Sequence, residues 1–162
     1  MFVKGGVILQ VKVVEKEELK VVGIAWNGTY SQTKKIPNLF TVMEERLREV
    51  QNKTNEPVLI APFHSRETEF TYFVTAPVEE ITEVPEGMVG FTIPRKNYVF
   101  TTHKGKAEEV ENTYRKIFSW MKDYGYEQDH QALSIEIYKE EYKPEYAVGN
   151  LIFDIYLPVR KY

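Results

Sequence analysis

Short runs rich in valine, isoleucine and aromatic residues recur along the chain, and they predict β-strands. Residues 7–26 contain two such runs around a polar bend at Glu15–Glu18. Two more runs, 57–65 and 70–78, flank the polar segment 66–69 and predict a hairpin. Further strands are predicted over residues 97–105, 131–142 and 150–159.

Two segments repeat apolar side chains at the three- and four-residue spacing of an amphipathic helix. The first covers residues 36–50, where Pro37 suits a first helical turn, and the second covers residues 106–124. The first apolar stripe consists of Ile36, Leu39, Phe40, Met43, Leu47 and Val50, and the second of Val110, Tyr114, Ile117, Phe118 and Met121. We expect both stripes to pack on the sheet as core.

The order strand, helix, strand, strand occurs twice, over about residues 5–80 and 88–160, and the acidic segment 78–87 joins the two halves. The pattern therefore predicts an α+β fold, in which duplicated β-α-β-β halves form one antiparallel sheet with the two main helices on one side. We expect a single domain over residues 1–162 with a central cleft near the pseudo-twofold axis, because ligand sites often form at such junctions.

Composition limits the classes of function. The chain has 162 residues, a net charge of −3 and no cysteine, so it shows no basic footprint for nucleic acid and cannot form disulfides. Apolar runs are too short for a membrane span, and the N-terminal segment lacks a signal-peptide pattern, so a cytoplasmic protein without membrane contact is expected. No helix-turn-helix is visible, and we expect no DNA-binding domain.

Motifs for catalysis, metals and cofactors are equally scarce. The three histidines, His64, His103 and His130, lack partners at metal-ligand spacing. No glycine-rich phosphate loop or nucleophile elbow is present. We therefore expect no metal and no cofactor.

The last two predicted strands, residues 131–142 and 150–159, carry two carboxylates that could be functional. Glu136 stands between Ile135 and Ile137, and alternation places it on the same strand face as Tyr138. On the last predicted strand, Asp154 and Tyr156 share a face. Either these faces are solvated, which makes the carboxylates ordinary surface groups, or they line a cavity, where a buried charge needs a compensating partner.

Several segments resemble the GyrI-like small-molecule-binding domain, the effector-binding module of bacterial multidrug-sensing transcription activators, in its free-standing form. The resemblance covers about residues 5–160 and rests on "IPRKNYVFTTHKG", "TYRKIFSWMKDYGYE", "IEIYKEEY" and "FDIYLPV" in the second half, and on "VVGIAWNGTYSQTKKIPNLFTVMEERL" and "FTYFVTAPVEE" in the first. It implies a ligand cleft between duplicated halves, in which aromatic rings stack on flat cationic compounds and a buried glutamate faces the positive charge. The matching glutamate here is Glu136, within "EIY".

The resemblance also implies further ligand-binding residues: Trp26, Tyr30, Tyr72, Trp120, Tyr138, Asp154 and Tyr156. Core packing is the competing interpretation for the aromatic residues, above all for Trp120, which follows the helix stripe. Two positions depart from the family pattern. Asp154 stands where relatives commonly carry glutamate, and Trp26 occupies a corner where polar or basic residues are usual.

Three functions are compatible with these features. The first is the binding of amphipathic, aromatic and cationic small molecules by a stand-alone sensor, sequestering or transcription-effector-type protein. The second is hydrolysis of strained electrophilic natural products, with Glu136 as general base. The third is a protein-interaction module that resembles a topoisomerase inhibitor and has a protein partner. Binding without catalysis is the interpretation that the residues favour.

Overall fold

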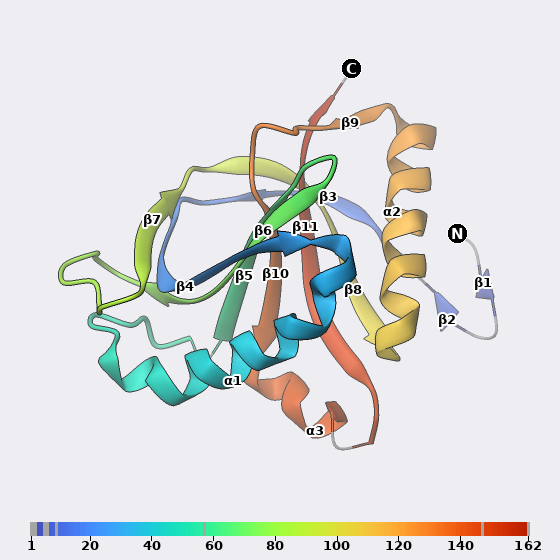
Figure 1. Ribbon diagram of the computed structural model, residues 1–162. Coiled ribbons are helices and arrows are strands. Elements are labelled where there is room, and N and C mark those ends of the chain that lie inside the picture. Colours follow the sequence, from blue (N-terminus) through green and yellow to red (C-terminus); the bar gives the residue numbers. More distant parts are fainter. Residues whose placement is uncertain (1–2, 5–6, 9, 57, 147, 162) are drawn as a thin grey trace.

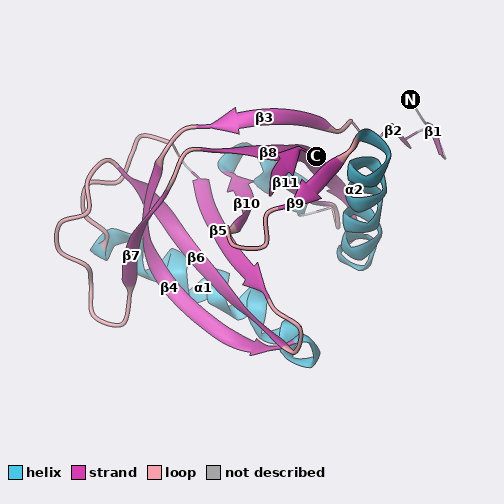
Figure 2. Ribbon diagram, turned by 90° about the horizontal axis from the view of Figure 1, so that it is seen from above, coloured by secondary structure: helices cyan, strands magenta, loops and turns pink. Residues whose placement is uncertain are grey.

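The computed structural model describes residues 3–4, 7–8, 10–56, 58–146 and 148–161, and it is an α+β fold built on one antiparallel sheet (Figures 1 and 2). Nine strands form this sheet: β3 (Lys12–Lys16), β4 (Leu19–Thr29), β5 (Val58–Ser65), β6 (Glu69–Val78), β7 (Val89–Ile93), β8 (Lys96–Gly105), β9 (Tyr126–Gln128), β10 (Ser134–Lys139) and β11 (Leu151–Lys161). A separate two-stranded sheet consists of β1 (Val3–Lys4) and β2 (Val7–Ile8).

Three α-helices accompany the sheet: α1 (Ile36–Arg46), α2 (Val110–Tyr124) and α3 (Lys143–Tyr146). Four 3-10 segments adjoin these helices: η1 (Tyr30–Lys35) and η2 (Leu47–Glu49) flank α1, η3 (Ala107–Glu109) precedes α2, and η4 (Glu140–Tyr142) precedes α3. Pro37 lies in the first turn of α1, as expected, and Gly125 ends α2 in a left-handed conformation with φ of 77°. No helix in the described part of the chain is long and apolar enough to cross a membrane.

The strand order confirms the duplication. Neighbouring strands follow the order β3-β8-β11-β10-β5-β6-β4-β7, and β9 pairs with β11. One half contributes β4, β5 and β6, the other contributes β8, β10 and β11, and the halves meet where β5 pairs antiparallel with β10. The strand that precedes each half pairs with the other half, since β3 lies beside β8 and β7 beside β4. Each half therefore pairs with the strand that precedes the other half, which joins the two halves within one sheet.

Both main helices pack on the same face of the sheet, as predicted. Met43 of α1 belongs to a core with Tyr72, Val74 and Leu59, whereas α2 packs on Phe153, Ile155 and Leu157 through Ile117 and Met121. Tyr138 contacts both cores. The opposite face has its own core, whose buried residues are Val21, Ile60, Ile93, Tyr98, Ile135 and Ile137.

Three details differ from the sequence-based expectations. Strands β7 and β9 were not predicted, and neither was the short helix α3 in the connection between the last two predicted strands. Phe118 was placed on the apolar stripe of α2 but is 43% exposed. Each residue advances an α-helix by about 100°, so Phe118 is turned away from the narrow stripe centred on Ile117 and Met121.

Candidate functional site

Strand β10 buries Glu136 on the helix-covered face of the sheet. Its neighbours Ile135 and Ile137 point to the opposite core, so alternation leaves the carboxylate on the face that α1 and α2 cover. On this face Ala61 of β5 and Ile155 of β11 stand directly opposite it. Only 8% of Glu136 is exposed. The solvated alternative is therefore wrong for this residue.

Three tyrosine hydroxyls surround the Glu136 carboxylate. Oε1 accepts hydrogen bonds from Tyr72 at 2.7 Å and Tyr138 at 2.8 Å, and Oε2 accepts one from Tyr114 at 2.6 Å. The donors come from β6, β10 and α2, so the carboxylate connects both halves of the fold. Hydrogen bonds to an ionised carboxylate are stronger than those between neutral groups, which stabilises the arrangement of the three tyrosines around Glu136.

The charge of Glu136 has no cationic counterpart among the described residues, because none of their ion pairs includes it. Burial raises the pKa of Glu136, while the hydroxyls of Tyr114, Tyr72 and Tyr138 oppose that rise. Burial, reinforced by the nearby carboxylate, also raises the pKa of each of the three tyrosines. The site thus holds a buried carboxylate whose negative charge a cation would stabilise.

Replacing Tyr114 by phenylalanine removes the sole hydrogen-bond donor to Oε2 among the described residues, and we expect the pKa of Glu136 to rise further. The loss of one charge-assisted hydrogen bond should lower the free energy of unfolding by about 1–3 kcal/mol. Carboxyl-carbon NMR titration of the glutamates would measure the pKa, and urea denaturation the stability. An unchanged or lower pKa would show that Tyr114 does not stabilise the charged form.

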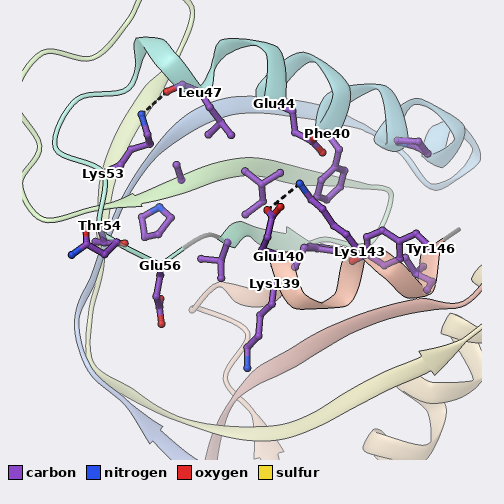
Figure 3. Close-up of a pocket in the computed structure, with 18 of the residues that line it drawn as sticks. Phe40, Glu44, Leu47, Lys53, Thr54, Glu56, Lys139, Glu140, Lys143 and Tyr146 are labelled. Carbon is purple, nitrogen blue, oxygen red and sulfur yellow. Dashed lines mark hydrogen bonds and ion pairs between the residues drawn. The ribbon is translucent and has the colours of Figure 1, made fainter.

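A cavity of about 640 Å³ borders the junction of the halves, between α1 and the segment that contains η4 and α3 (Figure 3). Its wall includes Leu59 of β5, Ala76 of β6 and Tyr138 of β10. The Phe40 ring of α1 meets the Tyr138 ring edge-on, with centroids 4.7 Å apart. Tyr138 both lines the cavity and donates to Glu136, whereas Glu136 itself is not part of the cavity wall.

Two predicted residues of the first half lie near this site on the same sheet face. Tyr72 is buried beside Glu136, and Trp26 is paired with Tyr72 across β4 and β6. The Trp26 ring contacts Phe70 edge-on at 5.3 Å. Tyr30 stacks on the same Phe70 at 5.1 Å and donates its hydroxyl to the carbonyl of Arg66, 2.5 Å away. Trp26 and Tyr30 therefore form a separate aromatic group around Phe70.

Three other predicted residues lie apart from Glu136. Trp120 of α2 stacks on Tyr124 and Tyr126, at 4.6 and 5.7 Å. The register pairs Glu136 with Ile155, which puts Asp154 and Tyr156 on the opposite sheet face. The structure thus brings together Glu136, Tyr72 and Tyr138, but neither Trp120 nor the β11 pair.

Asp154 is buried in a network of its own. Only 1% of the residue is exposed, and its Oδ1 accepts hydrogen bonds from Thr102 and Tyr142, both at 2.8 Å. Lys139 Nζ lies 3.3 Å from Oδ2. Lys139 is the last residue of β10, and Tyr142 belongs to η4. Through these two contacts Asp154 holds the segment that leads into α3, and this segment forms one wall of the cavity.

Tyr114 and Phe40 are the residues at the site that the sequence assigned only to core packing. A tyrosine within an apolar stripe needs a partner for its hydroxyl, and this signal could have identified Tyr114. His103 is buried and hydrogen-bonded to Thr113, 2.7 Å away. Among the described residues no cluster of three or more histidine, cysteine, aspartate or glutamate side chains could hold a metal.

The family model described as "GyrI-like small molecule binding domain" matches residues 9–160. The transcriptional regulator BrlR of Pseudomonas aeruginosa is 25% identical over 152 residues, which are 93% of this chain and 56% of BrlR. The chain therefore spans little more than half the length of this curated relative.

Two solved structures share the fold. The crystal structure of the EcmrR C-terminal domain matches with a TM-score of 0.73 and 18% identity, over 96% of this chain and 100% of that domain. The structure of SAV2435 bound to tetraphenylphosphonium matches with a TM-score of 0.68 and 14% identity, over 93% and 94% of the two chains. At these identities the likeness concerns the fold.

Proposed function

Because the chain belongs to the GyrI-like small-molecule-binding domain family, we propose that it binds amphipathic aromatic cations at Glu136, with the adjoining cavity as the approach. The observation that carries this proposal is a buried carboxylate with three tyrosine hydroxyls and no cationic partner among the described residues. A ligand cation would supply the missing charge, and the surrounding rings would add cation–π contacts of about 0.5–2 kcal/mol each.

Access to the carboxylate requires movement of Tyr138. Tyr138 lines the cavity and donates its hydroxyl to Glu136, and the Phe40 ring packs against its ring. A cation that enters the cavity first meets the faces of these rings, and rotation of Tyr138 then exposes Glu136. Binding therefore exchanges a hydroxyl donor for a full positive charge. The protein would act as a sensor or sequestering protein, or as the effector module of a transcription regulator.

The test uses two ions of the same size and shape and opposite charge. Isothermal titration calorimetry with tetraphenylphosphonium and with tetraphenylborate separates charge from hydrophobic contact. We expect the cation to bind and the anion to bind far more weakly. Triphenylphosphine oxide serves as a neutral probe of the aromatic contribution. Equal binding of both ions, or binding of neither, would contradict the proposal.

Binding should also depend on pH, since burial raises the pKa of Glu136. We expect affinity for the cation to increase as pH rises through that pKa, because the carboxylate must lose its proton to pair with the ligand. Below it, each binding event should release a proton. Calorimetry in buffers of different ionisation enthalpy measures this release, and affinity independent of pH would show that Glu136 does not titrate with binding.

The contribution of Glu136 to the free energy of unfolding should fall as pH rises, whereas the affinity for the cation should increase. The unfolded glutamate titrates near pH 4.3, below the folded pKa, so the folded state holds the proton more tightly. The contribution of Glu136 to stability is then fully present below about pH 4.3 and is lost as pH rises through the folded pKa. The difference in free energy of unfolding between wild type and Glu136→Gln, measured across this interval, isolates the effect.

A further inference from the structure

The cavity continues from Tyr138 along α1 to a second carboxylate, Glu44. Phe40 and Glu44 both line the cavity and extend from the same side of α1 (Figure 3). They are one helical turn apart, about 6 Å along the axis. Phe40 contacts Tyr138, and Tyr138 donates to Glu136, so two aromatic rings lead from the Phe40 and Glu44 side of α1 to the buried carboxylate.

Tyr146 of α3 completes the surroundings of Glu44 across the cavity. Burial raises the pKa of Tyr146, and the charge of Glu44 contributes to the rise. A carboxylate in a cavity that the Phe40 and Tyr146 rings also line combines the two features that favour an organic cation, namely opposite charge and an aromatic face.

The lysines of the cavity wall are already engaged by other groups. Lys53 Nζ donates to the Leu47 and Val50 carbonyls at the end of the first helical region. Lys143 pairs with Glu140 at 3.1 Å, and Lys139 lies near the Asp154 carboxylate. Glu44 forms no ion pair within the part of the chain that the structure describes.

Glu56, the other carboxylate of the wall without an ion pair among the described residues, is less suited to this role. Burial raises the pKa of Tyr156 on the opposite sheet face, and the charges of Asp154 and Glu56 add to the rise. Figure 3 likewise shows Glu56 extending away from α1, whereas Glu44 stands beside Phe40. Glu44 is therefore the acidic group that a ligand would meet beyond Tyr138.

We propose that the cavity selects elongated molecules with two cationic ends, one held at Glu136 and the other at Glu44. The spacer between the ends would lie on the apolar wall formed by Leu47, Val58, Leu59 and Ala76. This inference rests on the proposed function, because the inner end of the ligand uses the same carboxylate. It adds a preference for bis-cations over single cations of equal length.

A matched ligand series tests this preference in the full chain. The probes are two quinolinium groups joined by polymethylene spacers of increasing length, and single quinolinium compounds whose alkyl tails match those spacers. We expect the best bis-cation to bind about tenfold more tightly than its single-charge counterpart, as a cation–π contact and a partly exposed ion pair together provide. The advantage should peak at one spacer length, because both ends must be reached at once.

Two variants assign the effect to a residue. Glu44→Gln should remove the advantage of the bis-cation, so that its affinity falls to that of the single cation of matched length measured in the same variant. Glu45→Gln is the control, because Glu45 is exposed on the same helix and is not part of the cavity wall. It should retain the full advantage. Both side chains are exposed, so folding should be unaffected.

The outcomes separate the two proposals. Equal affinity for bis- and single cations in the wild type, or an advantage that survives Glu44→Gln, would overturn the inference and leave cation binding at Glu136 intact. If no quinolinium compound binds, the proposed function fails and the inference fails with it. A spacer-dependent advantage that is lost only in Glu44→Gln would support both.

Discussion

Glu136→Gln is expected to weaken the binding of an aromatic cation by about a hundredfold, with little effect on a neutral aromatic compound. Truncating the charge of a buried pair costs about 2–5 kcal/mol, and each 1.4 kcal/mol corresponds to a factor of ten in affinity. Glutamine keeps the size of the side chain and loses only its charge. Calorimetry measures the affinity of both proteins for the cation tetraphenylphosphonium and for the neutral compound triphenylphosphine oxide.

The variant should remain folded. Its amide oxygen can accept hydrogen bonds from Tyr72 and Tyr138, and its NH2 group can donate to the hydroxyl oxygen of Tyr114. Glu141→Gln is a suitable control, because Glu141 is exposed in η4 and does not line the cavity. Unaltered affinity for the cation in a folded Glu136→Gln protein would remove Glu136 as the counter-charge of the ligand.

Local patterns predicted the elements of this fold well. The apolar runs at 57–65 and 70–78 became the hairpin of β5 and β6, and the stripe that begins at Ile36 became α1. These segments succeed because side-chain periodicity and core contact coincide. Strand β7 was missed since Val89–Ile93 is short and only Ile93 among its residues is buried. Its pairing with β4 depends on a contact distant in sequence, which no local pattern contains.

The composition of the site was harder to predict than the fold. Alternation along a strand correctly paired Glu136 with Tyr138, and Asp154 with Tyr156. It cannot say which faces of two strands coincide, because that depends on the register between β10 and β11. The register pairs Glu136 with Ile155, so the two pairs point in opposite directions. Helix α2 then brings Tyr114 to the carboxylate, although 22 positions separate the two residues.

Asp154→Ala should lower the free energy of unfolding by about 2–4 kcal/mol. The change leaves the hydroxyls of the partly buried Thr102 and Tyr142 without their acceptor, and it removes the carboxylate beside Lys139. Unsatisfied buried donors cost about 1–3 kcal/mol each, whereas Lys139 is partly exposed and can turn to water. Tyr142→Phe deletes one hydrogen bond and should cost only about 1 kcal/mol. Urea denaturation of the three proteins measures these differences.

The same network determines whether Asp154 acts on a ligand directly or through the cavity wall. If it holds η4 and α3 in place, Asp154→Asn and Tyr142→Phe should weaken cationic and neutral compounds to a similar degree, because both disturb the wall. If Asp154 pairs with the ligand, Asp154→Asn should weaken cations alone and Tyr142→Phe should do little. Since Asp154 lies on the sheet face opposite Glu136, we expect the first pattern. Charge-selective loss in Asp154→Asn would instead place a ligand cation on the far side of the sheet.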